Sequence, residues 1–89
     1  MALLDLLGRR WALRVLWELR DEEVPTFREL QARCGGISSS VLSQRIAELR
    51  EARIVAPDAY ALTKEGRELL DVLTPVNDWA ARWAKRSVP

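Results

Sequence analysis

The 89-residue sequence contains no histidine and only one cysteine. Histidine is the commonest general base and a principal zinc ligand, so its absence excludes Ser-His and Cys-His catalytic pairs and any ordinary zinc site. The lone Cys34 excludes an internal disulfide and is typical of a reducing cytosol. The chain also lacks a P-loop and a Gly-x-Gly-x-x-Gly fingerprint. We therefore expect no catalysis, no metal and no cofactor.

Long apolar runs and a basic leader are missing as well. The unbroken apolar stretches are far shorter than the roughly 20 residues that cross a bilayer, and Met1–Asp5 has no basic segment typical of a secretory signal. The net charge is +1, but twelve of the fourteen basic residues are arginine. This excess either suits bidentate phosphate or guanine contacts or reflects a GC-rich genome. We expect a cytoplasmic protein with no membrane partner.

The most informative segment of the chain is Gly36–Leu49. Ser38 can cap a helix, with Ile37 before it and Leu42 after it in the positions of a hydrophobic staple. At about 100° per residue, one apolar face collects Leu42, Ile46 and Leu49, and the opposite face collects Ser40, Gln44 and Ala47. A helix with an apolar back and short polar front residues fits a DNA major groove.

A second helix is predicted directly before this segment. Thr26 and Glu29 have the spacing of a capping box, and the helix that follows carries Phe27, Leu30 and Cys34 inward, ending at Gly35–Gly36. Cys34 is therefore expected to be a small buried apolar residue. Two short helices around a glycine turn, the second running to about Arg53, are typical of a helix-turn-helix.

The remaining elements complete a recognisable order. Before the helix-turn-helix, a helix is expected over Arg10–Arg20. After it, the sequence predicts β-prone runs at 54–56 and 60–62 around a turn. A helix capped by Thr63 and a final helix starting at Thr74-Pro75 follow. The predicted fold is mainly α with a small β-hairpin, a winged helix-turn-helix with terminal helices for dimerisation. One domain is expected over 1–89, with 9–73 as helix-turn-helix and short wing and 1–8 and 74–89 as terminal dimerisation elements.

The terminal helices carry more apolar surface than one small core can absorb. Leu13 and Trp17 form a second stripe on the helix Arg10–Arg20, which predicts a contact outside the core. Trp79 and Trp83, four residues apart, either form one packing ridge or stack on a planar ligand. The expected interface of a homodimer consists of Leu13, Trp17, Val76, Trp79 and Trp83.

Several blocks of sequence carry a family resemblance. They are Gly8-Arg9-Arg10-Trp11, Trp17-Glu18-Leu19, Thr26-Phe27-Arg28-Glu29-Leu30, Gly36-Ile37-Ser38, Val41-Leu42-Ser43-Gln44-Arg45-Ile46, Glu48-Leu49, Tyr60-Ala61-Leu62-Thr63-Lys64-Glu65-Gly66 and Asp78-Trp79. In order and spacing the chain resembles the HxlR-type branch of the MarR-like winged helix-turn-helix transcription regulators. The resemblance implies a homodimer on double-stranded DNA, with one recognition helix per subunit in successive major grooves, and leaves any small-molecule effector unidentified.

The resemblance also implies a set of DNA-facing residues. Carried over position by position, they are Arg28, near a phosphate, and Ser39, Ser40, Ser43, Gln44 and Arg45. Gln44 can pair with adenine, as a glutamine amide does in the major groove. The three serines are either phosphate contacts or simply helix-start residues. Arg45 either holds a phosphate or pairs with a carboxylate such as Glu48 or Glu29.

The other arginines near these positions lead to different expectations. The cation of Arg28 opposes the dipole at the start of its helix, which favours an anionic partner. Arg9 and Arg10 are expected to be solvated or ion-paired.

Three departures from the family pattern bear on function. Arg53 stands where a glycine usually closes the recognition helix, so it must avoid or tolerate a positive φ. Pro57 and Asp58 replace the basic residues of the wing, and the N-terminal cysteine of redox-sensing members is missing. We expect a sequence-specific double-stranded DNA-binding transcriptional regulator acting as a homodimer. The alternative, favoured by the reduced wing and the near-neutral charge, is a winged-helix protein-interaction module with reduced or no DNA binding.

Overall fold

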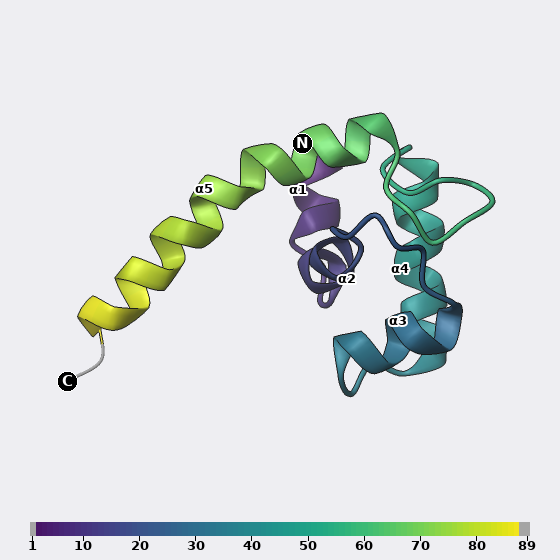
Figure 1. Ribbon diagram of the computed structural model, residues 1–89, viewed down its shortest axis with the longest axis horizontal. Helices are drawn as coiled ribbons and strands as arrows, with labels where there is room; N and C mark the ends of the chain where they lie inside the picture. The colour runs from purple at the N-terminus through teal and green to yellow at the C-terminus, as the bar shows by residue number, and fades with distance from the viewer. Residues whose placement is uncertain (1, 88–89) are drawn as a thin grey trace.

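The computed structural model describes residues 2–87, so Met1, Val88 and Pro89 of the expected 1–89 domain lie outside the described residues. The protein is mainly helical. Its helices are α1 (Ala2–Leu7), α2 (Ala12–Glu18), α3 (Phe27–Cys34), α4 (Ser39–Glu51) and α5 (Lys64–Ser87). Figure 1 shows α1 to α4 gathered in one body, from which α5 extends away to the C-terminus. No helix in this part of the chain is both long and apolar enough to cross a membrane.

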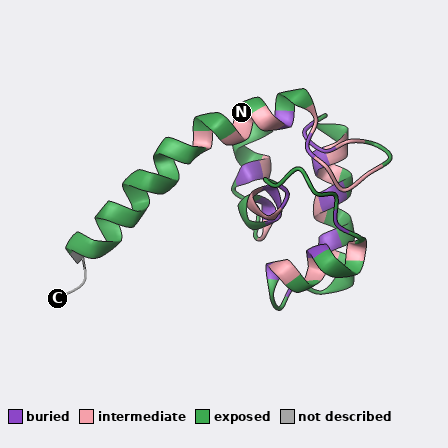
Figure 2. Cartoon of the chain, viewed as in Figure 1, coloured by how far each residue is buried: buried purple, intermediate pink, exposed green. Residues whose placement is uncertain are grey.

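The core is formed by apolar side chains from α1 to α4 and from the segment that follows α4. Its buried members are Leu7, Val15, Leu16, Leu19, Leu30, Cys34, Ile37, Leu42, Ile46, Leu49, Ile54, Val55 and Leu62. The first half of α5 covers one side of the core with half-buried Leu69, Leu70 and Leu73. Beyond them every described side chain from Thr74 to Arg86 is exposed (Figure 2).

Helix α2 confirms the prediction of two apolar stripes. Val15, Leu16 and Leu19 are buried in the core, whereas Leu13 is exposed. The expected start at Arg10 is wrong by two residues, because Trp11 adopts a left-handed conformation with φ 76°. This conformation costs a non-glycine residue roughly 1–2 kcal/mol, and it turns the chain sharply between α1 and α2.

The predicted caps of α3 and α4 are confirmed. The Glu29 amide donates to Thr26 Oγ1, and the Thr26 amide donates to Glu29 Oε1, both at 3.2 Å. The Val41 amide donates to Ser38 Oγ at 3.2 Å, which fixes the start of α4. Gly35 and Gly36 have positive φ values of 62° and 88° and end α3. These bonds join residues three apart, which is why the sequence predicts them.

The expected β-hairpin is reduced to one antiparallel bridge between Val55 and Leu62, and no strand forms within residues 2–87. Backbone hydrogen bonds flank this bridge, from the Ala56 amide to Ala61 O at 2.8 Å and from the Thr63 amide to Ile54 O at 3.0 Å, and the ladder extends no further within the described residues. The amide of Val55 donates to Leu49 O in α4, and the Arg50 guanidinium donates to the carbonyls of Ala56 and Ala59. Pro57 also lacks an amide hydrogen.

The expectation of a new helix at Thr74-Pro75 is wrong, because α5 is continuous through Pro75. A proline inside a helix lacks the amide donor, and its ring clashes with the carbonyl four residues earlier, so the helix changes direction there. Figure 1 shows that α5 bends along its length. Thr74 Oγ1 donates to Leu70 O at 2.9 Å in the preceding turn. The expected boundary between 9–73 and 74–89 therefore falls inside one helix.

The start of α5 is fastened to the end of α4 by Thr63 and Gly66. Thr63 Oγ1 accepts from the Gly66 amide at 3.0 Å, which confirms the predicted cap, and donates to Arg53 O at 2.6 Å. The Thr63 amide donates to Ile54 O at 3.0 Å. A Cβ added at Gly66 would lie 2.2 Å from that same carbonyl oxygen. Only glycine allows this close approach.

Replacing Gly66 with alanine is therefore expected to lower the free energy of unfolding by about 1–3 kcal/mol, since the backbone at Ile54 must move to admit a methyl group. Urea unfolding followed by circular dichroism measures the change. Gly8→Ala is the matched control, because its added Cβ would lie 3.3 Å from the carbonyl oxygen of Leu4, a much milder contact than the one at Gly66. Equal effects of the two substitutions would contradict the tight contact at Gly66.

Candidate nucleic-acid interface

The polar side of α4 faces solvent along the first half of the helix. Ser39, Ser40, Ser43 and Gln44 are all exposed. Leu42, on the opposite side, is fully buried. The hydroxyl groups of Ser38 and Ser40 lie 3.3 Å apart. The structure thus presents short polar side chains on a helix whose rotation is fixed by its buried face.

Arg28 lies in the first turn of α3, and its side chain is exposed. It lines the same shallow groove as Ser39, because the turn between α3 and α4 brings the two helix starts together. Gln31 Nε2 donates to Ile37 O at 3.2 Å and holds this turn. No carboxylate among the described residues pairs with Arg28, so its charge is available to an anionic partner.

Arg45 lies on the flank of α4 rather than on its exposed front. Of its predicted carboxylate partners it pairs with Glu48 and not with Glu29. Its Nε donates to Arg10 O at 2.9 Å. Arg9, expected to be solvated or ion-paired, pairs with the same Glu48 carboxylate. The sequence suggested Glu48 as a partner of Arg45, but gave no sign of the link to Arg10.

The chain leaves the C-terminal end of α4 through Arg53, at the position where glycine was expected. Arg53 tolerates a left-handed conformation with φ 63°. Arg50 fixes the segment that replaces the wing: its Nε donates to Ala56 O at 2.8 Å and its guanidinium lies 5.1 Å from the centre of the Tyr60 ring. That ring in turn lies 5.9 Å from the ring of Phe27 in α3. Nothing in the sequence indicated this function for Arg50.

Two titratable groups near these helices have shifted pKa values. The Thr26 amide, and after it the Thr26 side chain, hold the pKa of Glu29 below its ordinary value. Burial raises the pKa of the Cys34 thiol, and the negative charge of Glu18 raises it further. Within residues 2–87, no three His, Cys, Asp or Glu side chains are grouped closely enough to hold a metal ion.

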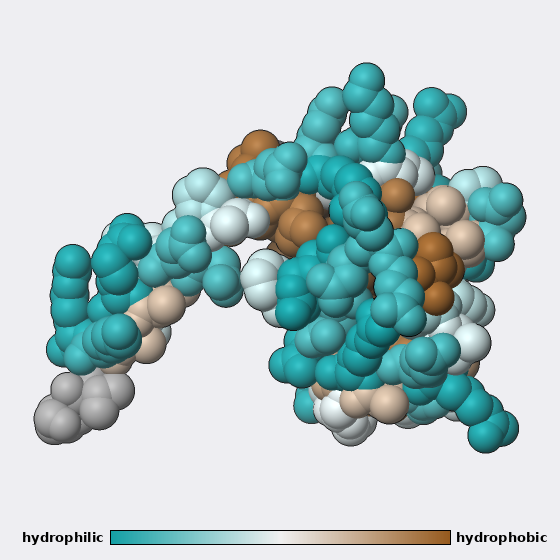
Figure 3. Space-filling model, in the orientation of Figure 1, coloured by the Kyte–Doolittle hydropathy of each residue, from teal (hydrophilic) through white to brown (hydrophobic). Residues whose placement is uncertain are grey.

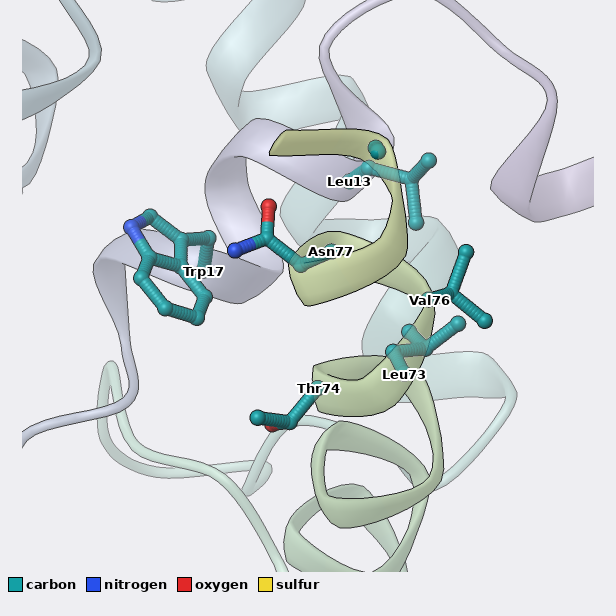
Figure 4. A pocket seen from close by; sticks show the side chains of 7 residues that line it. Leu13, Trp17, Leu73, Thr74, Val76 and Asn77 are labelled. Atoms are coloured by element: carbon teal, nitrogen blue, oxygen red, sulfur yellow. The ribbon is translucent and has the colours of Figure 1, made fainter. Parts of the chain in front are cut away.

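A separate apolar surface begins where α5 passes α2 and continues along the exposed part of α5. The exposed fractions are 50% for Leu13, 59% for Val76 and 54% each for Trp79 and Trp83, and Trp17 is half-buried. Figure 3 shows apolar surface near the point where α5 leaves the body. A cavity of about 260 Å³ lies there between the two helices (Figure 4). Its lining residues are Leu13, Trp17, Leu73, Thr74, Val76, Asn77 and Ala80.

The arrangement of α3, turn and exposed α4 defines a helix-turn-helix protein. The chain belongs to the HxlR-like helix-turn-helix family, whose model matches residues 6–88. It is similar to an HTH-type transcriptional regulator of Methanocaldococcus jannaschii, with 27% identity over 95 aligned positions covering 100% of this chain and 89% of that protein. It is also similar to the HTH-type transcriptional regulator YvaP of Bacillus subtilis, with 30% identity covering 89% of this chain and 81% of YvaP.

Solved structures share the fold over most of their length. A transcriptional factor from Thermoplasma volcanium superposes with a TM-score of 0.85 at 24% identity, covering 96% of this chain and 84% of the other. Quinone-bound YodB from Bacillus subtilis superposes with a TM-score of 0.79 at 28% identity, covering 91% and 93%. Family and relatives together identify this protein as a DNA-binding transcriptional regulator.

Because Cys34 is buried and its pKa is raised, we expect the native protein at pH 7 to react with a thiol reagent much more slowly than the unfolded protein does. The thiolate is the reactive form, so the rate should increase with pH. Cys34→Ser should leave DNA binding nearly unchanged. DNA binding that responds to peroxide in the wild type, but not in Cys34→Ser, would contradict this structural role.

Proposed function

We propose that this protein is a homodimer that recognises specific sequences in double-stranded DNA by placing α4 of each subunit in the major groove. The observation that carries the proposal is the exposed front of α4 opposite the buried Leu42. Gln44, whose amide offers both a donor and an acceptor, supplies base recognition. Arg28 and the hydroxyl groups of Ser39, Ser40 and Ser43 contact phosphates and fix the orientation of α4. Arg45, on the flank of the helix, pairs with Glu48 and supports this surface from the side.

Dimerisation through the terminal helices is supported by unpartnered apolar surface. Val76, Trp79 and Trp83 recur along α5 at spacings of three and four residues and are all more than half exposed. An apolar ridge of this kind is covered in most soluble proteins. A second copy of the chain offers a matching ridge, and two-fold symmetry puts the same patch on both subunits.

The charges of α5 favour an antiparallel arrangement of the two copies. The final part of the helix is basic, with Arg82, Lys85 and Arg86 and no acidic residue, so its net charge is +3. The part before it contains four acidic and two basic residues, a net charge of −2: Glu65, Glu68, Asp71, Asp78, Lys64 and Arg67. Antiparallel pairing places the basic part of each copy beside the acidic part of the other, which steers association and fixes its register.

In light scattering at micromolar concentration we expect about twice the chain mass of 10.2 kDa. Trp83→Ala should weaken the dimer by about 2 kcal/mol or more, as truncation of a central interface tryptophan does. Arg86→Ala is the matched control on the same helix, and an exposed ion pair contributes only about 1 kcal/mol or less. A wild-type protein that remains monomeric would contradict the dimer.

For DNA recognition, Gln44→Ala is expected to weaken binding to a selected site by about 1–3 kcal/mol and to relax the preference at one base position. Arg28→Ala should weaken binding to all sequences equally and reduce the slope of log K against log salt by about 0.9 for each phosphate that Arg28 neutralises. Selection from random duplexes, followed by fluorescence anisotropy at several salt concentrations, measures both effects.

The alternative is a protein-interaction module. One observation favours it, because the segment 54–62 forms a single β-bridge and contains no lysine or arginine. The same selection separates the two functions. A dimer with no sequence preference at low salt, and no change on Gln44→Ala, would contradict recognition by α4 and support the interaction module.

A further inference from the structure

The connection between α1 and α2 is held directly against the flank of α4. Arg45 Nε donates to the carbonyl oxygen of Arg10 at 2.9 Å. The guanidinium groups of Arg9 and Arg45 both pair with the carboxylate of Glu48. These contacts fix residues 8–11 beside the middle of the helix that carries Gln44.

The dimensions of DNA determine what lies at this position. An α-helix with its side chains is about 10–12 Å across, and the major groove is about 12 Å wide. A helix seated in the groove therefore fills it, and an element fixed to the flank of that helix lies over the rim, where the phosphates are. In the proposed complex, residues 8–11 occupy such a position.

The charge of this cluster is suited to phosphate. Arg9, Arg10, Arg45 and Glu48 together carry three positive charges and one negative charge, a net charge of +2. Arg45 is only 13% exposed, and its guanidinium donates to Glu48 and to the Arg10 carbonyl. Arg9 is 52% exposed, and the Arg10 side chain is exposed, with its guanidinium 5.7 Å from the centre of the Trp11 ring. The accessible charge therefore belongs to Arg9 and Arg10.

We propose that Arg9 and Arg10 contact DNA phosphates beside α4, and that Arg45 and Glu48 are positioning residues that hold them there. This inference rests on the proposed function, because it requires α4 to enter the major groove. It gives the protein a basic element outside the segment 54–62, which carries no lysine or arginine.

The test compares Arg10→Gln with Arg10→Lys, which keeps the charge. Anisotropy titrations with the selected duplex and with a random duplex are repeated over a range of salt concentrations. Arg10→Gln should weaken binding to both duplexes by the same factor and reduce the salt slope of the dimer by about 1.8, or 0.9 for each subunit. Arg10→Lys should retain the wild-type slope.

The outcomes separate this inference from the proposed function. If Gln44→Ala alters base preference while Arg10→Gln keeps the wild-type slope, the phosphate contact is overturned and recognition by α4 stands. If the wild-type dimer does not bind DNA, both are overturned.

The positioning function of Arg45 has its own measurement. Hydrogen–deuterium exchange of the DNA-free protein should be faster at residues 8–11 in Arg45→Ala than in the wild type, because the hydrogen bond to the Arg10 carbonyl is removed. Gln44→Ala, one residue away on the exposed front, is the matched control and should leave that exchange unchanged. Equal exchange at residues 8–11 in Arg45→Ala and the wild type would overturn the positioning function of Arg45.

Discussion

The rest of the structure depends on one constraint, the orientation in which α4 is held about its own axis. Leu42, Ile46 and Leu49 are at most 3% exposed, and burial of such side chains stabilises the fold by roughly 1.5–3 kcal/mol each. Because successive side chains on a helix are separated by about 100°, this burial fixes Gln44 on the outside and Glu48 on the flank. The polar front and the contact with the α1–α2 connection both follow from one packed face.

Local hydrogen bonds made much of the fold predictable from sequence. The caps at Thr26, Ser38 and Thr63 each join residues three apart, so a short sequence window contains all the information they need. The course of the chain at Trp11 and Pro75 was not predictable in this way. A left-handed tryptophan and a proline inside a helix are both locally unfavourable. Trp11 packs against the core, whereas Pro75 lies in an exposed part of α5.

The candidate site divides along the same line. Hydrophobic periodicity was sufficient to place Ser40 and Gln44 on the exposed side of α4. Periodicity did not predict the hydrogen bond from Arg45 to the Arg10 carbonyl, because the two residues are 35 positions apart in sequence. The wing was expected from β-prone runs, but these runs form only one bridge, and beside it the Arg50 guanidinium binds the carbonyl of Ala56. The sequence alone does not show that an arginine on a helix will bind a backbone carbonyl of the segment that follows.

The continuity of α5 through Pro75 has a geometric consequence. The part of α5 beyond its half-buried leucines, residues 74–87, extends about 21 Å along the helix axis at 1.5 Å per residue. In the proposed dimer, this part of α5 carries the apolar ridge of Val76, Trp79 and Trp83 away from the core. A residue inserted into it would rotate everything beyond by about 100°. An insertion after Leu73 would therefore change the direction in which this apolar ridge faces relative to α4, while the exposed surface of α4 stays the same.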